Sequence, residues 1–369
     1  MKNEWRSGGG VSDAAEVPLS WPKPLVSIVV LAAWLIAAPA ASPQTPKIVV
    51  ENYFVPARDA GVQLYVRNKR PEGVTKFGSE KILLFVHGAT YPGETAFDLP
   101  LGGVSWMDYV AQRGFDVYLM DVRGYGPSTR PLEMSRPPED GPPIVHTDVA
   151  VRDVGAVVDH IRARRGVSKI NLLGWSWGTV LAGAYTARNN DKIQRLVLYA
   201  PSFIRASAIR MTPAPTPAES PLGAYRTVTK EAAQKRWRTG LSDERAKDLM
   251  PDQWFDMWWA ANMASDPVGA AQNPPVVRAP NGVIDDGRKY WSAGKAYYDP
   301  STITVPTLLI LAEWDADTPF YMAQAVFAKL TNAPRKRLVL IGEGTHGVAL
   351  EKNRTQLFRE VQLFFEEPN

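Results

Sequence analysis

Apolar residues along this chain fall into short runs that alternate with segments of helical spacing, which predicts strands and helices in turn. Residues 81–88 and 115–121 are continuous apolar runs, as expected of strands buried on both faces. Residues 103–114 between them repeat apolar positions at helical spacing and end on a glycine that is expected to cap the helix. The earlier runs at 47–56 and 62–68 predict an opening pair of strands.

The same alternation continues through the middle of the chain. Residues 148–166 carry apolar side chains three and four positions apart, which predicts an amphipathic helix that ends near its last glycine. A strand at 169–174, a helix at 176–188 and a strand at 193–201 are expected to follow. Strands that alternate with helices in this way predict an α/β fold, with a mostly parallel, doubly wound sheet covered by helices on both sides.

The alternation stops after the sixth expected strand. Residues 203–300 are rich in proline, aromatic residues and short helical patterns, and they contain no convincing strand. Strand-like runs return at 305–315 and 335–342, each followed by a helix. We therefore expect a mostly helical cap, 203–300, inserted between the two parts of one α/β core, 42–202 and 301–369.

The N-terminal segment has the layout of an export signal. Residues 25–41 are uncharged and apolar, Lys23 precedes them, and they end in the small-residue sequence Ala38-Pro39-Ala40. We expect residues 1–41 to be a signal peptide, which would make the mature protein periplasmic or secreted. An uncleaved membrane anchor is the alternative, and the mature form is otherwise expected to have no membrane partner.

Composition narrows the chemistry. The 42 basic and 38 acidic residues leave a net charge of +4 that is scattered along the chain, so a nucleic-acid partner is not expected. The sequence has no cysteine, which excludes a thiolate nucleophile and a cysteine-based metal cluster. No metal or cofactor is expected, and the oligomeric state is left open. Of the four histidines, His146 and His160 fall in polar surroundings and are expected to be solvated.

One short segment, NLLGWSWGTV at 171–180, places Ser176 between Gly174 and Gly178, where a strand passes into a helix. A sharp turn here would force the serine backbone into a strained conformation, and side chains two residues away on either side would collide. The pattern by itself is moderately specific, and a serine that only caps the helix is the alternative. The strand before it and the helix after it favour a nucleophile.

A serine hydroxyl needs a general base, and the base needs a carboxylate. His346 lies in a glycine-flanked loop after the last strand, and Asp315 follows the strand after the cap. Both positions are at the carboxyl ends of parallel strands, where open α/β sheets place their sites. Asp317 competes with Asp315, but we interpret Asp317 as a charge at the next helix start, with Thr318 as the N-cap and Pro319 as the first helical residue.

These segments together resemble the α/β-hydrolase fold superfamily over residues 48–366. FVHGAT at 85–90 resembles its oxyanion loop, and DVRGYGPS at 121–128 resembles its D-x-R-G-x-G-x-S loop. The S-W-G sequence and the cap resemble the prolyl-aminopeptidase side of the superfamily, although Trp175 stands where that subfamily has glycine.

The resemblance implies roles for individual residues. The backbone N–H groups of Ala89 and Trp177 would form an oxyanion hole, and His87 would orient its own loop without transferring a proton. Asp315 matches the superfamily's D-x-x-T-P pattern. The expected substrate contacts come from aromatic residues near the nucleophile and in the cap; they are Trp175, Tyr91, Trp254 and Trp258.

The sequence thus predicts an exported serine hydrolase with the triad Ser176, Asp315 and His346. The expected substrate is a small or medium-sized carboxylic ester with an apolar or aromatic group, because the cap is rich in tryptophan. An aminopeptidase or amidase of the prolyl-aminopeptidase type is one alternative. An acyltransferase using the same triad and a binding protein on an inactive scaffold are two others.

Overall fold

The structure is a computed structural model, and it describes residues 46–205 and 221–368. The expected signal peptide lies outside the described residues, as do residues 206–220 of the expected cap. Within the part that is described, no helix combines the length and the apolar character needed to cross a membrane.

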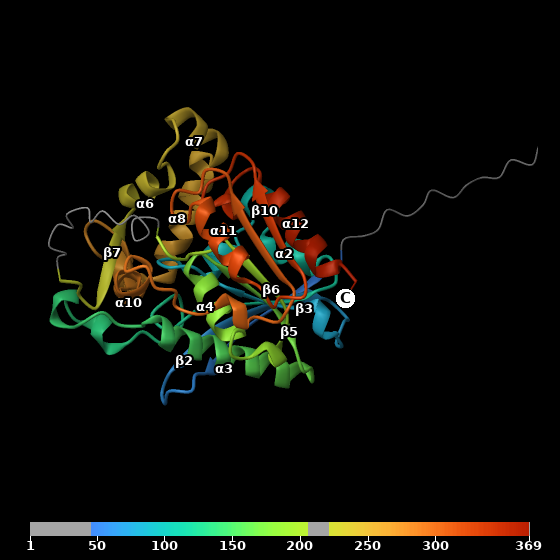
Figure 1. Cartoon of the computed structure of the whole chain (residues 1–369). Coiled ribbons are helices and arrows are strands. Elements are labelled where there is room, and N and C mark those ends of the chain that lie inside the picture. Colours follow the sequence, from blue (N-terminus) through green and yellow to red (C-terminus); the bar gives the residue numbers. More distant parts are fainter. Residues whose placement is uncertain (1–45, 206–220, 369) are drawn as a thin grey trace, which may run out of the picture. The chain divides into compact units, whose positions relative to one another are not determined.

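The described residues form an α/β core around one mixed sheet of eight strands (Figure 1). The spatial order is β1-β2-β4-β3-β5-β6-β9-β10. The first pair is antiparallel, β2 pairs antiparallel with β4, and the remaining neighbours are parallel. The strands are β1 (Ile48–Pro56), β2 (Gln63–Pro71), β3 (Ile82–Val86), β4 (Asp116–Met120), β5 (Ile170–Trp175), β6 (Ile193–Tyr199), β9 (Thr307–Ala312) and β10 (Lys336–Ile341).

Helices cover both faces of this sheet, as the alternating pattern predicted. One apolar core lies between the sheet and the buried faces of α3, α4 and α11, and a second lies between the sheet and α2 and α12. Strands β3, β4, β5 and β9 are buried along their whole length, which is why they appear in the sequence as mostly apolar runs. The helices are α2 (Trp106–Ala111), α3 (Thr147–Arg165), α4 (Trp177–Thr186), α11 (Phe320–Lys329) and α12 (Arg354–Glu366).

Local signals fix several helix ends. Helix α3 ends where Gly166 adopts a left-handed conformation with φ of 65°, as expected of a glycine cap. Helix α2 is shorter than predicted: Ser105 caps its first turn by accepting the Asp108 backbone N–H, and its last residue is Ala111. Gly114 has φ of 84° but lies beyond the helix, in the turn that leads into β4.

The segment between β6 and β9 carries the additional elements that the sequence assigned to a cap. The prediction that it has no strand is wrong, because β7 and β8 form a two-stranded antiparallel sheet. Both strands are only five residues long, so their alternation is too short to stand out among the prolines and helical patterns. The elements are β7 (Tyr225–Thr229), α6 (Lys230–Trp237), α7 (Asp243–Leu249), α8 (Asp252–Ser265), α9 (Pro267–Ala270), β8 (Val276–Pro280) and α10 (Gly282–Asp286).

Candidate active site

Ser176 lies on a sharp turn between β5 and α4. Its backbone has φ of 57° and ψ of −120°, a left-handed conformation that is strained for any residue with a side chain. A Cβ added to Gly174 would lie 2.1 Å from the Gly178 carbonyl oxygen, and one added to Gly178 would lie 2.3 Å from the Val86 carbonyl oxygen. The two glycines are therefore required by close backbone packing around the serine, as the sequence predicted.

Asp315 and His346 meet at the carboxyl ends of β9 and β10. The His346 ring nitrogen Nδ1 is 2.9 Å from Asp315 Oδ2 and 3.0 Å from Oδ1. The Asp315 side chain is almost fully buried, and its Oδ1 accepts the backbone N–H groups of Asp317 at 3.0 Å and Thr318 at 2.8 Å. These backbone bonds hold the carboxylate toward Nδ1, which leaves Nε2 as the ring nitrogen for proton exchange.

The pKa of His346 is raised above its ordinary value. Burial acts to lower it, but the charge of Asp315 and its hydrogen bond outweigh burial, and the charge of Asp317 adds to the rise. The guanidinium of Arg236 acts in the opposite direction. An imidazolium is therefore well stabilised at this position, which suits a general base that must hold a proton during a reaction.

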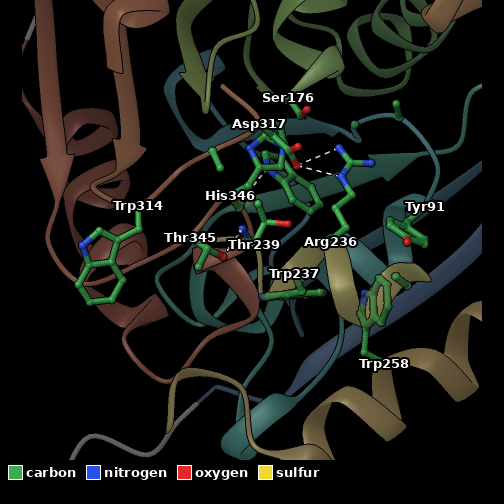
Figure 2. Close-up of a pocket in the computed structure, with 16 residues that line it drawn as sticks. Tyr91, Ser176, Arg236, Trp237, Thr239, Trp258, Trp314, Asp317, Thr345 and His346 are labelled. Atoms are coloured by element: carbon green, nitrogen blue, oxygen red, sulfur yellow. Dashed lines mark hydrogen bonds and ion pairs between the residues drawn. The ribbon is translucent and has the colours of Figure 1, made fainter. Parts of the chain in front are cut away.

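The interpretation of Asp317 and Thr318 as helix-start residues is wrong. Helix α11 begins at Phe320 with Pro319 as its N-cap, and no side chain caps it. Thr318 Oγ1 instead donates to Asp315 Oδ2 at 2.8 Å. Asp317 pairs with Arg236 of α6, with Oδ2 2.9 Å from Nη2 and 3.0 Å from Nε (Figure 2). A bond to Asp315, three residues back, and an ion pair with Arg236 of α6 thus replace the helix-start roles that the sequence suggested for Thr318 and Asp317.

The loop after β3 packs closely against the serine turn. A Cβ added to Gly88 would lie 3.0 Å from Ser176 Cβ. Ala89 is therefore the residue next to the point where this loop comes closest to Ser176. Val122 N–H donates to His87 Nε2 at 3.1 Å, so Nδ1 carries the proton and donates to the Gly88 carbonyl oxygen at 2.7 Å. Burial lowers the pKa of His87 to about 4, so the ring is neutral and fixed in one tautomer, consistent with a role in orienting its loop.

The two tryptophans beside Ser176 point in different directions. Trp177 is the first residue of α4, so its backbone N–H is not used by the helix, while its buried indole donates to Thr147 Oγ1 at 3.1 Å. Trp175 stacks on Tyr199 with ring centroids 5.7 Å apart and donates to the His346 carbonyl oxygen at 3.1 Å. Trp175 therefore supports the histidine loop as well as lining the pocket.

A pocket of about 690 Å³, partly open to solvent, brings these residues together with the cap (Figure 2). Its aromatic wall comes from Tyr91, Trp237 and Trp258; the Trp258 ring lies edge-on to both others, at centroid distances of 4.5 and 5.1 Å. The described lining comprises Gly88, Ala89, Tyr91, Trp175, Ser176, Ala233, Arg236, Trp237, Thr239, Trp258, Trp314, Ala316, Asp317, Thr345, His346 and Gly347.

Trp254, an expected substrate contact, does not line this pocket. The Arg354 guanidinium lies 4.7 Å from its ring centroid, so Trp254 packs between the cap and α12. Sequence reasoning missed Arg236 as a pocket residue, and it named no role for Trp237. Ala233, Arg236 and Trp237 are three and four residues apart on α6, and this spacing was the available signal that they share one helix face.

The two histidines that were expected to be solvated are both half-buried. His160 packs against Tyr53 with ring centroids 5.5 Å apart. His146 Nδ1 lies 3.0 Å from Asp286 Oδ1, and with Asp285 these groups form a cluster that could reach a metal ion. Each carboxylate already has a protein partner, since Asp286 accepts the Thr147 backbone N–H and Asp285 pairs with Lys289.

Comparison with known structures agrees with the fold. A serine hydrolase involved in carbazole degradation superposes with a TM-score of 0.57 at 15% identity, over 86% of this chain and 98% of its own. A serine hydrolase from Cycloclasticus zankles gives 0.55 at 16% identity, over 86% and 98%. A thermophilic esterase from Thermogutta terrifontis gives 0.51 at 15% identity, over 86% and 100%. At these identities the likeness establishes the fold and not the substrate.

The sequence itself gives the family. A search of curated protein sequences found no match. A family model described as alpha/beta hydrolase fold matches residues 81–353, which is more than half of the chain and includes the serine turn, the cap and both loops of the pair Asp315–His346. The chain therefore belongs to the alpha/beta hydrolase fold family, and it is a hydrolase of that superfamily.

Proposed function

We propose that this protein is a serine hydrolase that cleaves a carboxylic ester of a small or medium-sized apolar or aromatic molecule. The observation that carries the proposal is the bond between the buried Asp315 and His346, together with the strained Ser176 turn, which lines the same pocket as His346. A nucleophile, an oriented base and a carboxylate are the three groups that acyl transfer by serine needs.

In the proposed reaction, His346 Nε2 takes the Ser176 hydroxyl proton while Oγ attacks the ester carbonyl carbon. The oxyanion would accept hydrogen bonds from the backbone N–H groups of Ala89 and Trp177. His346 then returns the proton to the alkoxide that leaves, so an alcohol departs and an acyl group stays on Oγ. Water, deprotonated by His346, attacks the acyl carbonyl and releases a carboxylic acid and the free serine.

The pocket favours an ester over an aminoacyl substrate. An aminopeptidase must bind a protonated amine, which calls for a carboxylate that is free to pair with it. Within the described lining of the pocket, the carboxylate that faces the space is Asp317, and Arg236 already occupies it. The aromatic wall formed by Tyr91, Trp237 and Trp258 instead favours burial of an apolar acyl or aryl group.

A series of p-nitrophenyl esters tests this proposal. Each methylene that becomes buried contributes roughly 0.8 kcal/mol, so kcat/KM should rise about fourfold per carbon over the first few carbons. Trp258→Ala should flatten that rise, whereas Trp254→Ala, on the same helix but outside the pocket, should leave it in place. Alanine or proline anilides should be far poorer substrates. Anilide turnover that exceeds ester turnover and disappears on N-acetylation would establish the aminopeptidase alternative.

Acyl transfer to an alcohol or amine would use the same acyl group on Ser176. Product analysis in the presence of small alcohols separates the two: a hydrolase forms mainly the acid, and an acyltransferase forms mainly the new ester.

We also propose that the protein is exported, on the support of the apolar segment 25–41 and its small-residue end. N-terminal sequencing of the protein recovered from a periplasmic fraction tests this. Cleavage near residue 41 is the expected result, and recovery of an intact N-terminus in the cytoplasm would contradict it.

A further inference from the structure

Arg226, on the first strand of the cap sheet, reaches across to the loop that follows β3. Its Nη2 donates to Thr90 Oγ1 at 2.6 Å, and its Nη1 donates to the Pro280 carbonyl oxygen at 2.5 Å. One planar guanidinium therefore joins both cap strands, β7 and β8, to the residue after Ala89. Arg226 is half-buried, and burial lowers the pKa of its guanidinium.

The charge of Arg226 is not matched by a carboxylate in the described part of the chain. Arg278 on β8 differs from Arg226 in this respect, because it is buried and its charge is matched by Asp266 at 2.7 Å. A cation that is withdrawn from water without a counter-ion costs free energy. In the described part of the chain Arg226 gives its hydrogen bonds to neutral acceptors, the Thr90 hydroxyl and the Pro280 carbonyl oxygen.

Thr90 is the acceptor that lies next to Ala89. It is buried and has φ of 90°, a left-handed conformation that is rare for a β-branched residue. Strained residues of this kind persist only where their surroundings hold them. The bond from Arg226 holds the Thr90 side chain, and it thereby fixes the residue that directly follows Ala89 in the loop that carries the Ala89 N–H.

We propose that Arg226 is a positioning residue for the oxyanion hole, so that the cap contributes to catalysis as well as to substrate binding. This inference rests on the proposed function, in which Ala89 N–H binds the oxyanion. Arg226 does not line the described pocket and does not touch the reacting atoms. Arg226 acts through Thr90. While the Arg226–Thr90 bond is intact, the loop is fixed before substrate binds; without the bond, the position of the Ala89 N–H relative to the oxyanion is no longer fixed.

The test compares two arginines of the same small sheet. Arg226→Met removes the bond to Thr90, while Arg278→Met disturbs the cap without touching the oxyanion loop. Each variant is assayed for kcat and KM on a p-nitrophenyl ester, for the affinity of a trifluoromethyl ketone that forms an oxyanion on Ser176, and for Tm. Arg226→Met should lower kcat at least tenfold and weaken the ketone by a similar factor, with KM changed less than threefold. Arg278→Met should lower Tm with little change in kcat.

A double-mutant cycle shows whether Arg226 acts through Thr90. Thr90→Ala removes the acceptor, and Thr90→Ser keeps it as a control. The effect of Arg226→Met should nearly vanish in the Thr90→Ala background and persist in Thr90→Ser. If Arg226→Met does not fold, the two Thr90 variants test the same bond from its acceptor. Thr90→Ala breaks the bond and should lower kcat, whereas Thr90→Ser keeps the bond and should leave kcat unchanged.

Three results would overturn the inference: kcat within twofold of wild type in Arg226→Met, an equal loss of kcat in Arg278→Met, or multiplicative losses in the double variant. A wild-type protein that neither hydrolyses esters nor binds the ketone on Ser176 would instead refute the proposed function. The two failures are therefore distinguishable.

Discussion

Asp315→Asn is the substitution for which the structure gives the sharpest expectation. Asp315 Oδ1 accepts two backbone N–H groups, and Oδ2 accepts the Thr318 hydroxyl and lies 2.9 Å from His346 Nδ1, against 3.0 Å for Oδ1. The carbonyl oxygen of the asparagine will occupy the Oδ1 position, because only an acceptor can satisfy the two backbone donors. The amide nitrogen must then take the Oδ2 position.

An amide nitrogen at that position donates to His346 Nδ1 instead of accepting from it. The ring is thereby held with its proton on Nε2, which can no longer accept the proton of Ser176. In serine proteases this inversion of the tautomer lowers kcat by about 10⁴, which corresponds to about 5.5 kcal/mol of transition-state stabilisation. We expect a loss of similar size here, with the fold unchanged because every backbone bond is retained.

The assay is kcat/KM on a p-nitrophenyl ester together with Tm, with Asp317→Asn as the matched control. Asp317 is two residues away, and its carboxylate pairs with Arg236 and not with His346. The substitution Asp317→Asn should therefore change turnover less than tenfold at the optimal pH. Equal losses in both variants, or a larger loss in Asp317→Asn, would refute the assignment of the carboxylate to Asp315.

Three further predictions concern charge. Because Asp317 helps to raise the pKa of His346, Asp317→Asn should move the acid limb of kcat/KM to lower pH. Arg236→Gln removes a charge that lowers this pKa, so it should move the limb to higher pH; shifts in one direction for both variants would contradict the account. Burial raises the pKa of Asp121 to about 7. Between about pH 4 and 7 the folded protein therefore holds a proton on Asp121 that the unfolded chain does not, so the free energy of unfolding falls as the pH rises through this range. Asp121→Asn should therefore gain on the order of 3 kcal/mol relative to wild type between pH 5 and 8 in urea unfolding; a constant difference would count against a proton held at this site.

The features that the sequence predicted correctly are those that leave a signal in a short stretch of residues. Gly174 and Gly178 are demanded by backbone contacts within one turn and with β3, so they appear as a short motif. The buried strands of the sheet appear as mostly apolar runs because both of their faces are covered. Gly166 ends α3 by its own conformation. Each of these features leaves a signal within a few neighbouring residues, even where its physical cause is a distant contact.

Most of the features that were missed depend on partners far away in the chain. Thr318 and Asp317 carry every local sign of a helix start, yet Thr318 donates to Asp315, three residues back, and Asp317 pairs with an arginine 81 residues away. Trp254 and Trp258 lie one turn apart on α8, and only the packing of the cap decides that Trp258 faces the pocket while Trp254 meets Arg354. The β7–β8 pair is likewise specified by its partner and by burial more than by its own short pattern.

The most direct test of the account is the chemical identity of the acylated residue. Wild-type protein and Ser176→Ala are treated with an organophosphonate probe, and the adduct is located by peptide mass spectrometry alongside ester turnover. We expect a single adduct on Ser176 in the wild type, and neither adduct nor more than residual turnover in the folded variant. An adduct on another residue, or turnover that survives in Ser176→Ala, would contradict it.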